Sequence, residues 1–98
     1  MTNTLTITRY RVCIRNARDE HGALRRIELS GDNSDDAHVT LQFLAGEPLP
    51  RVEQRDDDPM WYISFPLTHY DAVLDLLRNE APVELHFAAP DTASLLTR

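Results

Sequence analysis

Lysine is absent from this chain of 98 residues, so every basic side chain other than histidine is an arginine. Cysteine occurs once, at Cys13, which excludes an internal disulfide and a zinc site built from several cysteines. Three glycines are too few for a glycine-rich phosphate loop. No apolar run reaches the roughly 20 residues that a membrane helix needs, and the amino terminus lacks a signal-peptide pattern. These absences predict a cytoplasmic protein with no cofactor, no metal and no membrane contact.

Charge is distributed unevenly along the chain. Residues 1–30 hold six arginines against three carboxylates, whereas the remainder holds four against thirteen, for a net charge of −6. Affinity for nucleic acids depends mainly on neutralising phosphates, so the overall acidity disfavours a nucleic-acid partner. The basic amino-terminal part keeps nucleic-acid or anion binding as an alternative function.

The length fits one domain over residues 1–98. Apolar and polar residues alternate along several stretches, which is typical of strands with one buried face. The pattern predicts an antiparallel meander of about four strands, over residues 4–15, 23–30, 38–44 and 60–65. A short edge strand over residues 51–54 is a further candidate, because Pro48 and Pro50 exclude a long central strand in that region.

The first predicted strand changes its apolar phase along its length. Leu5 and Ile7 occupy odd positions, whereas Val12 occupies an even one. A one-residue shift moves side chains to the opposite face of a sheet, so a bulge near Thr8 and Arg9 is expected to restore the phase.

One amphipathic helix is predicted over about residues 68–79. Thr68 fits the N-cap with Asp71 three residues later, and one apolar stripe runs along the helix. A final strand follows over about residues 83–88, and residues 89–98 are expected as a loosely docked tail. The fold class is therefore predicted as α+β, with the helix on one sheet face.

The opposite sheet face stays uncovered, since one helix shelters a single side of a sheet. Surface candidates for binding on that face are Arg9, Arg11, Arg15, Arg26, Tyr62, Glu84 and His86. The leading hypothesis is a noncatalytic interaction module that binds another protein, or a second copy as a homodimer, through a sheet face or an edge strand.

Enzymatic interpretations have less support. Cys13 lies between Arg11 and Arg15, and neighbouring cations stabilise a thiolate, but no oxyanion loop or nucleophile turn accompanies it. His86 is a second titratable candidate. The carboxylates Asp56, Asp57 and Asp58 predict a solvated turn, because consecutive residues of an extended chain point to opposite sides. A thiol- or histidine-dependent enzyme therefore ranks third, and no catalytic residue is assigned.

One segment carries a resemblance. "YDAVLDLLRNEAPVELHF" resembles the pattern Y-x-A-V-x-D-L-L-R-N-E-x-P-V, followed by an aromatic-rich strand, of certain short bacterial proteins without an assigned activity. The resemblance implies a bacterial origin and a shared corner between helix and strand. It implies no activity.

Overall fold

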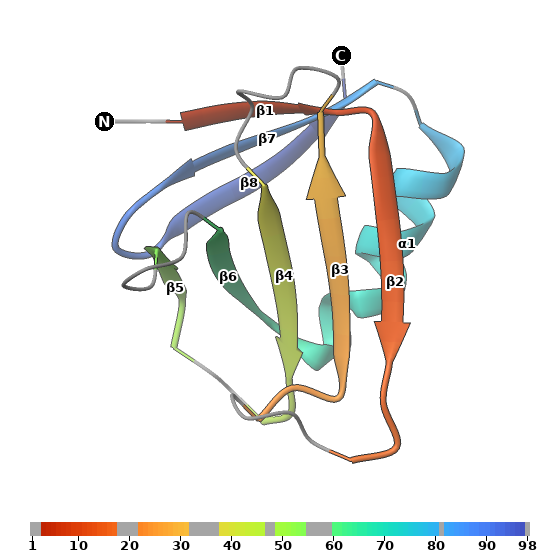
Figure 1. Cartoon of the computed structure of the whole chain (residues 1–98), viewed down its shortest axis with the longest axis vertical. Coiled ribbons are helices and arrows are strands. Elements are labelled where there is room, and N and C mark those ends of the chain that lie inside the picture. The colour runs from red at the N-terminus through yellow and green to blue at the C-terminus, as the bar shows by residue number, and fades with distance from the viewer. Residues whose placement is uncertain are drawn as a thin grey trace.

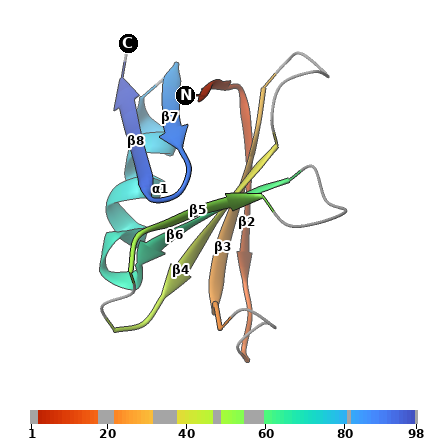
Figure 2. The ribbon, with the colours of Figure 1, turned by 90° about the vertical axis from the view of Figure 1, so that its left-hand side faces the viewer.

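The computed structural model describes residues 3–17, 22–31, 38–46, 49–54, 60–80 and 82–97, and these form two sheets with one helix beside them (Figures 1 and 2). In chain order the elements are β1 (Asn3–Ile7), β2 (Arg9–Ile14), β3 (Arg25–Ser30), β4 (Val39–Leu44), β5 (Arg51–Gln54), β6 (Trp61–Pro66), a 3₁₀ turn (Leu67–His69), α1 (Tyr70–Asn79), β7 (Val83–Ala88) and β8 (Thr92–Thr97). The α+β class is confirmed. Within the described residues, the predicted meander of about four strands is part of a more detailed arrangement of eight strands in two sheets.

The larger sheet has the strand order β2-β3-β4-β6-β5. Its first three strands are sequential antiparallel neighbours, as the alternation predicts, but β6 pairs with β4 in parallel. The short strand β5 explains why β6 runs parallel to β4. The chain leaves β4, runs back along the edge as β5, and turns into β6, which inserts between the two strands. Two reversals bring β6 into the same direction as β4.

The smaller sheet is antiparallel, with the order β1-β7-β8. Its last strand occupies residues that the sequence predicts as a loosely docked tail. Burial alternates along this strand: Ala93 and Leu95 pack against the core, whereas Ser94 and Leu96 are exposed. Since β7 lies between β1 and β8, the carboxyl-terminal strand completes this sheet.

The change of apolar phase, which the sequence explains by a bulge near Thr8 and Arg9, lies at a corner between the two sheets. Residues before it belong to β1 and residues after it to β2. The Thr8 backbone N–H donates to the Ser30 carbonyl oxygen at 3.0 Å, which fixes the corner against β3. The slip in apolar phase therefore marks a change of sheet, as at the corners of packed sheets where one strand passes between layers.

The helix begins differently from its prediction. A 3₁₀ turn precedes α1, His69 is its N-cap, and no side chain caps that end, so Thr68 is not the cap. At the other end, the Asn79 side-chain amide donates to the Asp75 carbonyl oxygen at 3.0 Å. The buried residues of α1 are Tyr70, Val73 and Leu77, which confirms the predicted apolar stripe.

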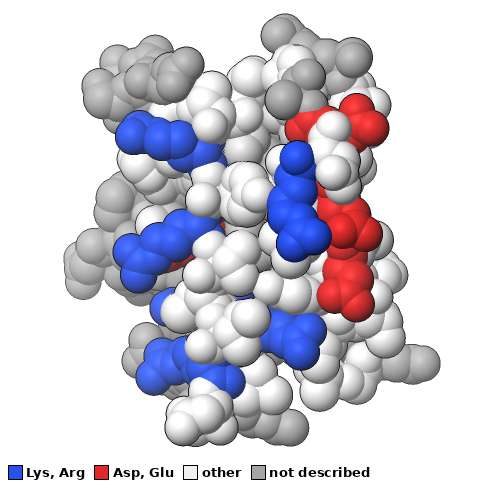
Figure 3. All heavy atoms as spheres, turned by 90° about the vertical axis from the view of Figure 1, so that its right-hand side faces the viewer, with Lys and Arg blue, Asp and Glu red and all other residues white. Residues whose placement is uncertain are grey.

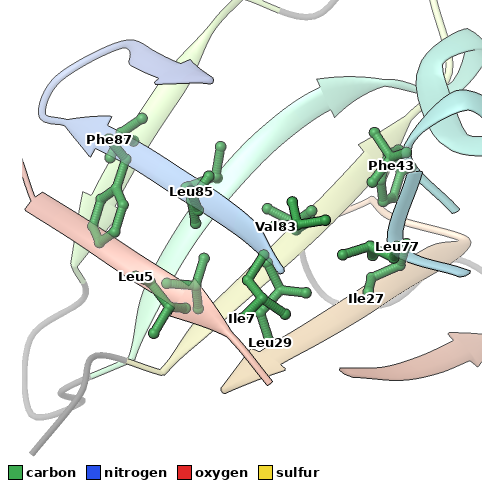
Figure 4. Close-up of a cluster of buried hydrophobic side chains, with 14 of the residues drawn as sticks. Leu5, Ile7, Ile27, Leu29, Phe43, Leu77, Val83, Leu85 and Phe87 are labelled. Atoms are coloured by element: carbon green, nitrogen blue, oxygen red, sulfur yellow. The ribbon is translucent and has the colours of Figure 1, made fainter. Parts of the chain in front are cut away.

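The core lies between the two sheets and α1. Figure 4 shows Leu5, Ile7 and the alternate residues of β7 directed toward Ile27 and Leu29 of the larger sheet. Leu85 and Phe87 have no exposed surface, and Phe43 is 1% exposed. Each large side chain buried in this way stabilises the fold by roughly 1.5–3 kcal/mol. The shared core makes the two sheets one packing unit.

Candidate functional site

The side of the larger sheet that faces away from the core is polar, and we call it the polar face. Two rows of paired residues cross it. One row contains Arg11, Glu28, Thr40, Tyr62 and Glu53. The next contains Cys13, Arg26, Gln42, Ser64 and Arg51. The structure thus brings together Arg11, Arg26 and Tyr62 from the predicted candidates, with Arg9 and Arg15 on the same side at the two ends of β2.

The centre of the polar face is closed to solvent. The sequence predicts that this whole face is uncovered, but Thr40 and Gln42 on it are each only 3% exposed. The Gln42 Nε2 atom is buried and makes no hydrogen bond with the described residues. Thr40 and Gln42 are buried because β4 is a central strand, with the side chains of β3 on one side of it and those of β6 on the other. The accessible part of the polar face lies toward its margins.

The arginines at the β2 margin differ in their partners. The Arg11 Nε atom lies 3.5 Å from Glu28 Oε1, and 78% of the Arg11 side chain is exposed. Among the described residues, Arg9 and Arg15 form no ion pair with a carboxylate. The Arg26 Nη2 atom lies 3.9 Å from the Cys13 sulfur. The outermost row of guanidinium groups is therefore hydrated and accessible.

A hollow of about 340 Å³ opens at the end of the sheet where β2 begins. Arg9, Arg11, His38 and Ser30 line it, together with Tyr10 and Met60. Two guanidinium groups, an imidazole and a hydroxyl supply donors for an oxyanion, while Glu28 is the carboxylate in its lining. The hollow is thus suited to a carboxylate or phosphate group.

β2 forms one edge of the larger sheet and is the right-hand strand of that sheet in Figure 1, where α1 lies beyond it. The Arg15 N–H donates to the Leu24 carbonyl oxygen at 2.9 Å in the β2–β3 register, so the odd-numbered residues of β2 direct their backbone groups toward β3. Consequently Tyr10, Val12 and Ile14 direct their N–H and C=O groups outward. We call this row of outward backbone groups, on the side of β2 away from β3, the open edge.

The same three residues present an apolar strip beside the open edge. Val12 packs against the core, whereas Tyr10 is 37% and Ile14 65% exposed. Figure 3 looks onto this side of the molecule and shows a row of basic side chains along the left margin, uncharged side chains in the middle, and further basic side chains beside the carboxylates on the right. The helix α1, which carries Asp71 and Asp75, lies on the same side of the molecule in Figure 1. An apolar strip therefore borders the open edge, with the arginines of β2 on one side and a mixture of basic and acidic side chains on the other.

The opposite edge of the larger sheet is partly occupied. The Val52 N–H of β5 donates to the Pro90 carbonyl oxygen, in the turn between β7 and β8, at 2.6 Å. Val52 itself is 2% exposed. β5 also has four residues, against six in β2. Of the two edges of this sheet, β2 offers the longer row of outward backbone groups.

Two of the predicted candidates lie elsewhere. Glu84 and His86 belong to β7, in the centre of the smaller sheet, so they do not join the arginines of the polar face. The His86 Nε2 atom is buried and makes no hydrogen bond with the described residues. Ile14 shares the even-numbered, apolar phase of Val12, yet it is 65% exposed. Only the strand order shows that these residues border an edge.

Over the described ranges, no group of three histidine, cysteine or acidic side chains could hold a metal ion. His21 and the carboxylates Asp56, Asp57 and Asp58 lie outside those ranges. No helix in the part of the chain that the structure describes combines the length and apolar character needed to cross a membrane. No family model, curated protein or solved structure matches the chain.

Proposed function

We propose that this protein is a noncatalytic interaction module that binds another polypeptide through the open edge of β2. The observation that supports it is the combination of outward backbone groups at Tyr10, Val12 and Ile14 with exposed apolar side chains on the same residues. In strand addition, main-chain hydrogen bonds give affinity and alternate side chains give specificity. β2 supplies both components on a stretch of six residues.

A second copy of the chain fits this edge less well than a different polypeptide does. Hydrogen bonding between two antiparallel copies requires their even-numbered residues to pair with one another. In the register that places Val12 of one copy opposite Val12 of the other, Arg9 of each copy lies opposite Arg15 of the other copy, so two arginine pairs form. In the register centred on Arg11, that residue faces its own copy. Like charges directly opposite one another destabilise a strand pair, so self-pairing of β2 is disfavoured.

Selection of peptides from a random displayed library tests strand addition even while the natural partner is unidentified. The decisive comparison uses Ile14→Pro and Ile14→Thr. Proline removes the outward N–H, whereas threonine keeps the N–H and the branched Cβ. Peptides selected on the wild-type protein should bind Ile14→Thr but lose binding to Ile14→Pro. Peptides that bind Ile14→Pro as tightly as the wild type would contradict the use of the open edge.

Anion binding is the second candidate function, and the hollow bordered by Arg9, Arg11 and His38 favours it. Titration with inorganic phosphate, followed through backbone amide chemical shifts, would show changes clustered at Ser30 and His38. The variant Arg9→Gln should weaken this binding, whereas Arg51→Gln, at the opposite edge of the sheet, should not. Changes spread evenly over all arginines would indicate nonspecific ion pairing instead.

A further inference from the structure

Building on the strand addition proposed above, we infer that the occupant of the open edge is an extended segment of another polypeptide in which carboxylate side chains alternate with apolar ones. The inference concerns the chemistry of the partner, which strand addition alone leaves undefined. Main-chain hydrogen bonds do not distinguish one extended sequence from another, so specificity has to come from the two sets of side chains beside the open edge.

The basic side sets the first requirement. Arg9, Arg11 and Arg15 project from the same side of β2, together with Cys13, at every second residue. Side chains on one side of an added strand repeat at the same spacing of about 6.6–6.8 Å, so alternate residues of the partner face them directly. Arg9 and Arg15 have no ion-pair partner among the described residues. Carboxylates at those alternate positions would supply one.

The hollow at the beginning of β2 reinforces this requirement. It brings Ser30 of β3 and His38, which precedes β4, beside Arg9 and Arg11, and the Glu28 carboxylate in its lining is paired with Arg11. A partner carboxylate entering it therefore meets donors from Arg9, Ser30 and His38. Guanidinium groups form two parallel hydrogen bonds with a carboxylate, which favours this group over a neutral amide. The hollow therefore provides a binding position for an acidic residue at one end of the partner segment.

The apolar side sets the second requirement. The intervening residues of the partner lie beside Tyr10 and Ile14, whose exposed surfaces are contiguous with the core through Val12. Branched or aromatic side chains at these positions would cover both residues. Charged groups there would lose hydration without gaining a partner.

The charge pattern also separates this partner from two others. A second copy presents arginines to arginines, as described above. A nucleic acid strand carries a negative charge on every phosphate, and the net charge of −6 on this protein disfavours its binding. A segment that is acidic on one side only meets the arginines and leaves the apolar strip to uncharged residues.

Three synthetic peptides test the inference. Each has a central segment of six residues, the length of β2, with valine at alternate positions and glutamate, glutamine or lysine at the others. Uncharged polar tails keep them soluble. Fluorescence anisotropy with the full chain should show the glutamate peptide binding on the order of tenfold more tightly than the glutamine peptide, with the lysine peptide weakest. Added salt should reduce this difference.

Charge reversal identifies the residues responsible. The double variant Arg9→Glu and Arg15→Glu should favour the lysine peptide over the glutamate peptide. Arg51→Glu makes a similar change on the opposite edge of the sheet and should keep the wild-type order. Ile14→Pro should weaken binding of the glutamate peptide, and Ile14→Thr should preserve it. Thermal unfolding of each variant establishes that it is folded before its binding is compared.

Each alternative result has a distinct meaning. Equal affinity for all three peptides, lost in Ile14→Pro, would overturn the acidic partner while leaving strand addition intact. Glutamate binding that Ile14→Pro does not change would overturn both, because the arginines would then bind anions without a strand. Displacement of the glutamate peptide by an equal concentration of single-stranded oligothymidylate would overturn the polypeptide partner in favour of a phosphate backbone.

Discussion

Arg15 donates its backbone N–H to the carbonyl oxygen of Leu24 at 2.9 Å, one residue beyond the end of β2. This single contact continues the β2–β3 register and determines which residues of β2 face β3 and which face solvent. The open edge follows from this register, whereas the alternation of side chains along β2 separates the arginines from the apolar strip. A shift of one residue would exchange their positions.

Proline substitution at two adjacent residues would test this register in the protein alone. Ile14→Pro removes an outward N–H from an exposed position and is expected to cost less than about 1 kcal/mol of unfolding free energy. Cys13→Pro removes an N–H directed toward β3 and should cost about 1–3 kcal/mol through the unpaired acceptor it leaves, with any strain in addition. Chemical denaturation measures both values. A larger loss for Ile14→Pro than for Cys13→Pro would show that the register is wrong.

Gln42 provides a test of the closed centre of the polar face. Its Nε2 atom is buried without a hydrogen-bond partner among the described residues, and such a group costs roughly 1–3 kcal/mol. Gln42→Met keeps the length of the side chain and removes the polar atoms. We expect the free energy of unfolding to rise by about 1 kcal/mol. Gln42→Ala is the control, because it also removes the amide but leaves a cavity and should destabilise the protein. A loss of stability in Gln42→Met would indicate that the amide is satisfied.

Two leucines of equal chemistry should respond differently to truncation. Leu85 has no exposed surface in the core between the sheets, whereas Leu49 is 81% exposed. Leu85→Ala is expected to reduce the unfolding free energy by about 2–5 kcal/mol, through lost burial and the cavity left behind. Leu49→Ala should change it by less than about 0.5 kcal/mol. Similar effects of the two substitutions, measured by thermal or urea unfolding, would argue against a core between the two sheets.

Self-association should depend on the arginines of β2. The wild-type protein is expected to sediment as a monomer, since the registers centred on β2 oppose arginines. Arg15→Glu places a glutamate opposite Arg9 in the symmetric register through Val12, and two cross-strand pairs change sign at roughly 0.5–1 kcal/mol each. The association constant should therefore rise about tenfold.

Analytical ultracentrifugation over a concentration series measures this change. Arg51→Glu carries the same change of charge at the opposite edge and should remain monomeric. A wild-type dimer whose amide exchange is slowed at Tyr10 and Val12 would contradict the expectation, because it would show that β2 pairs with itself despite its arginines.

Local patterns predicted several elements well. Period-two alternation identified β3, β4, β6 and β7, and the apolar stripe identified α1, because these elements bury residues at their own intrinsic spacing. The sequence also indicated a short strand near Arg51 despite the neighbouring prolines. In each of these cases the side chains that define the pattern meet the core directly.

Long-range pairing was less accessible. The phase change near Thr8 predicts a local irregularity, and only the pairing of β1 with β7 and of β2 with β3 shows that the chain changes sheet there. The parallel pairing of β4 with β6 likewise depends on where β5 lies. The sequence also placed Glu84 and His86 on one face with the arginines, because it does not show that β7 belongs to a different sheet from β2. The sequence identified the candidate residues as surface positions. It did not show that β2 is an edge strand of the sheet.

The corner at Thr8 has a mechanical consequence. One continuous stretch of chain supplies an edge strand to each sheet, so this stretch links the two sheets covalently. Peeling away residues 3–14 would strip an outer strand from both layers in a single event. A partner that binds β2 would therefore also oppose the detachment of β1 from the smaller sheet. Its binding would stabilise both sheets against unfolding.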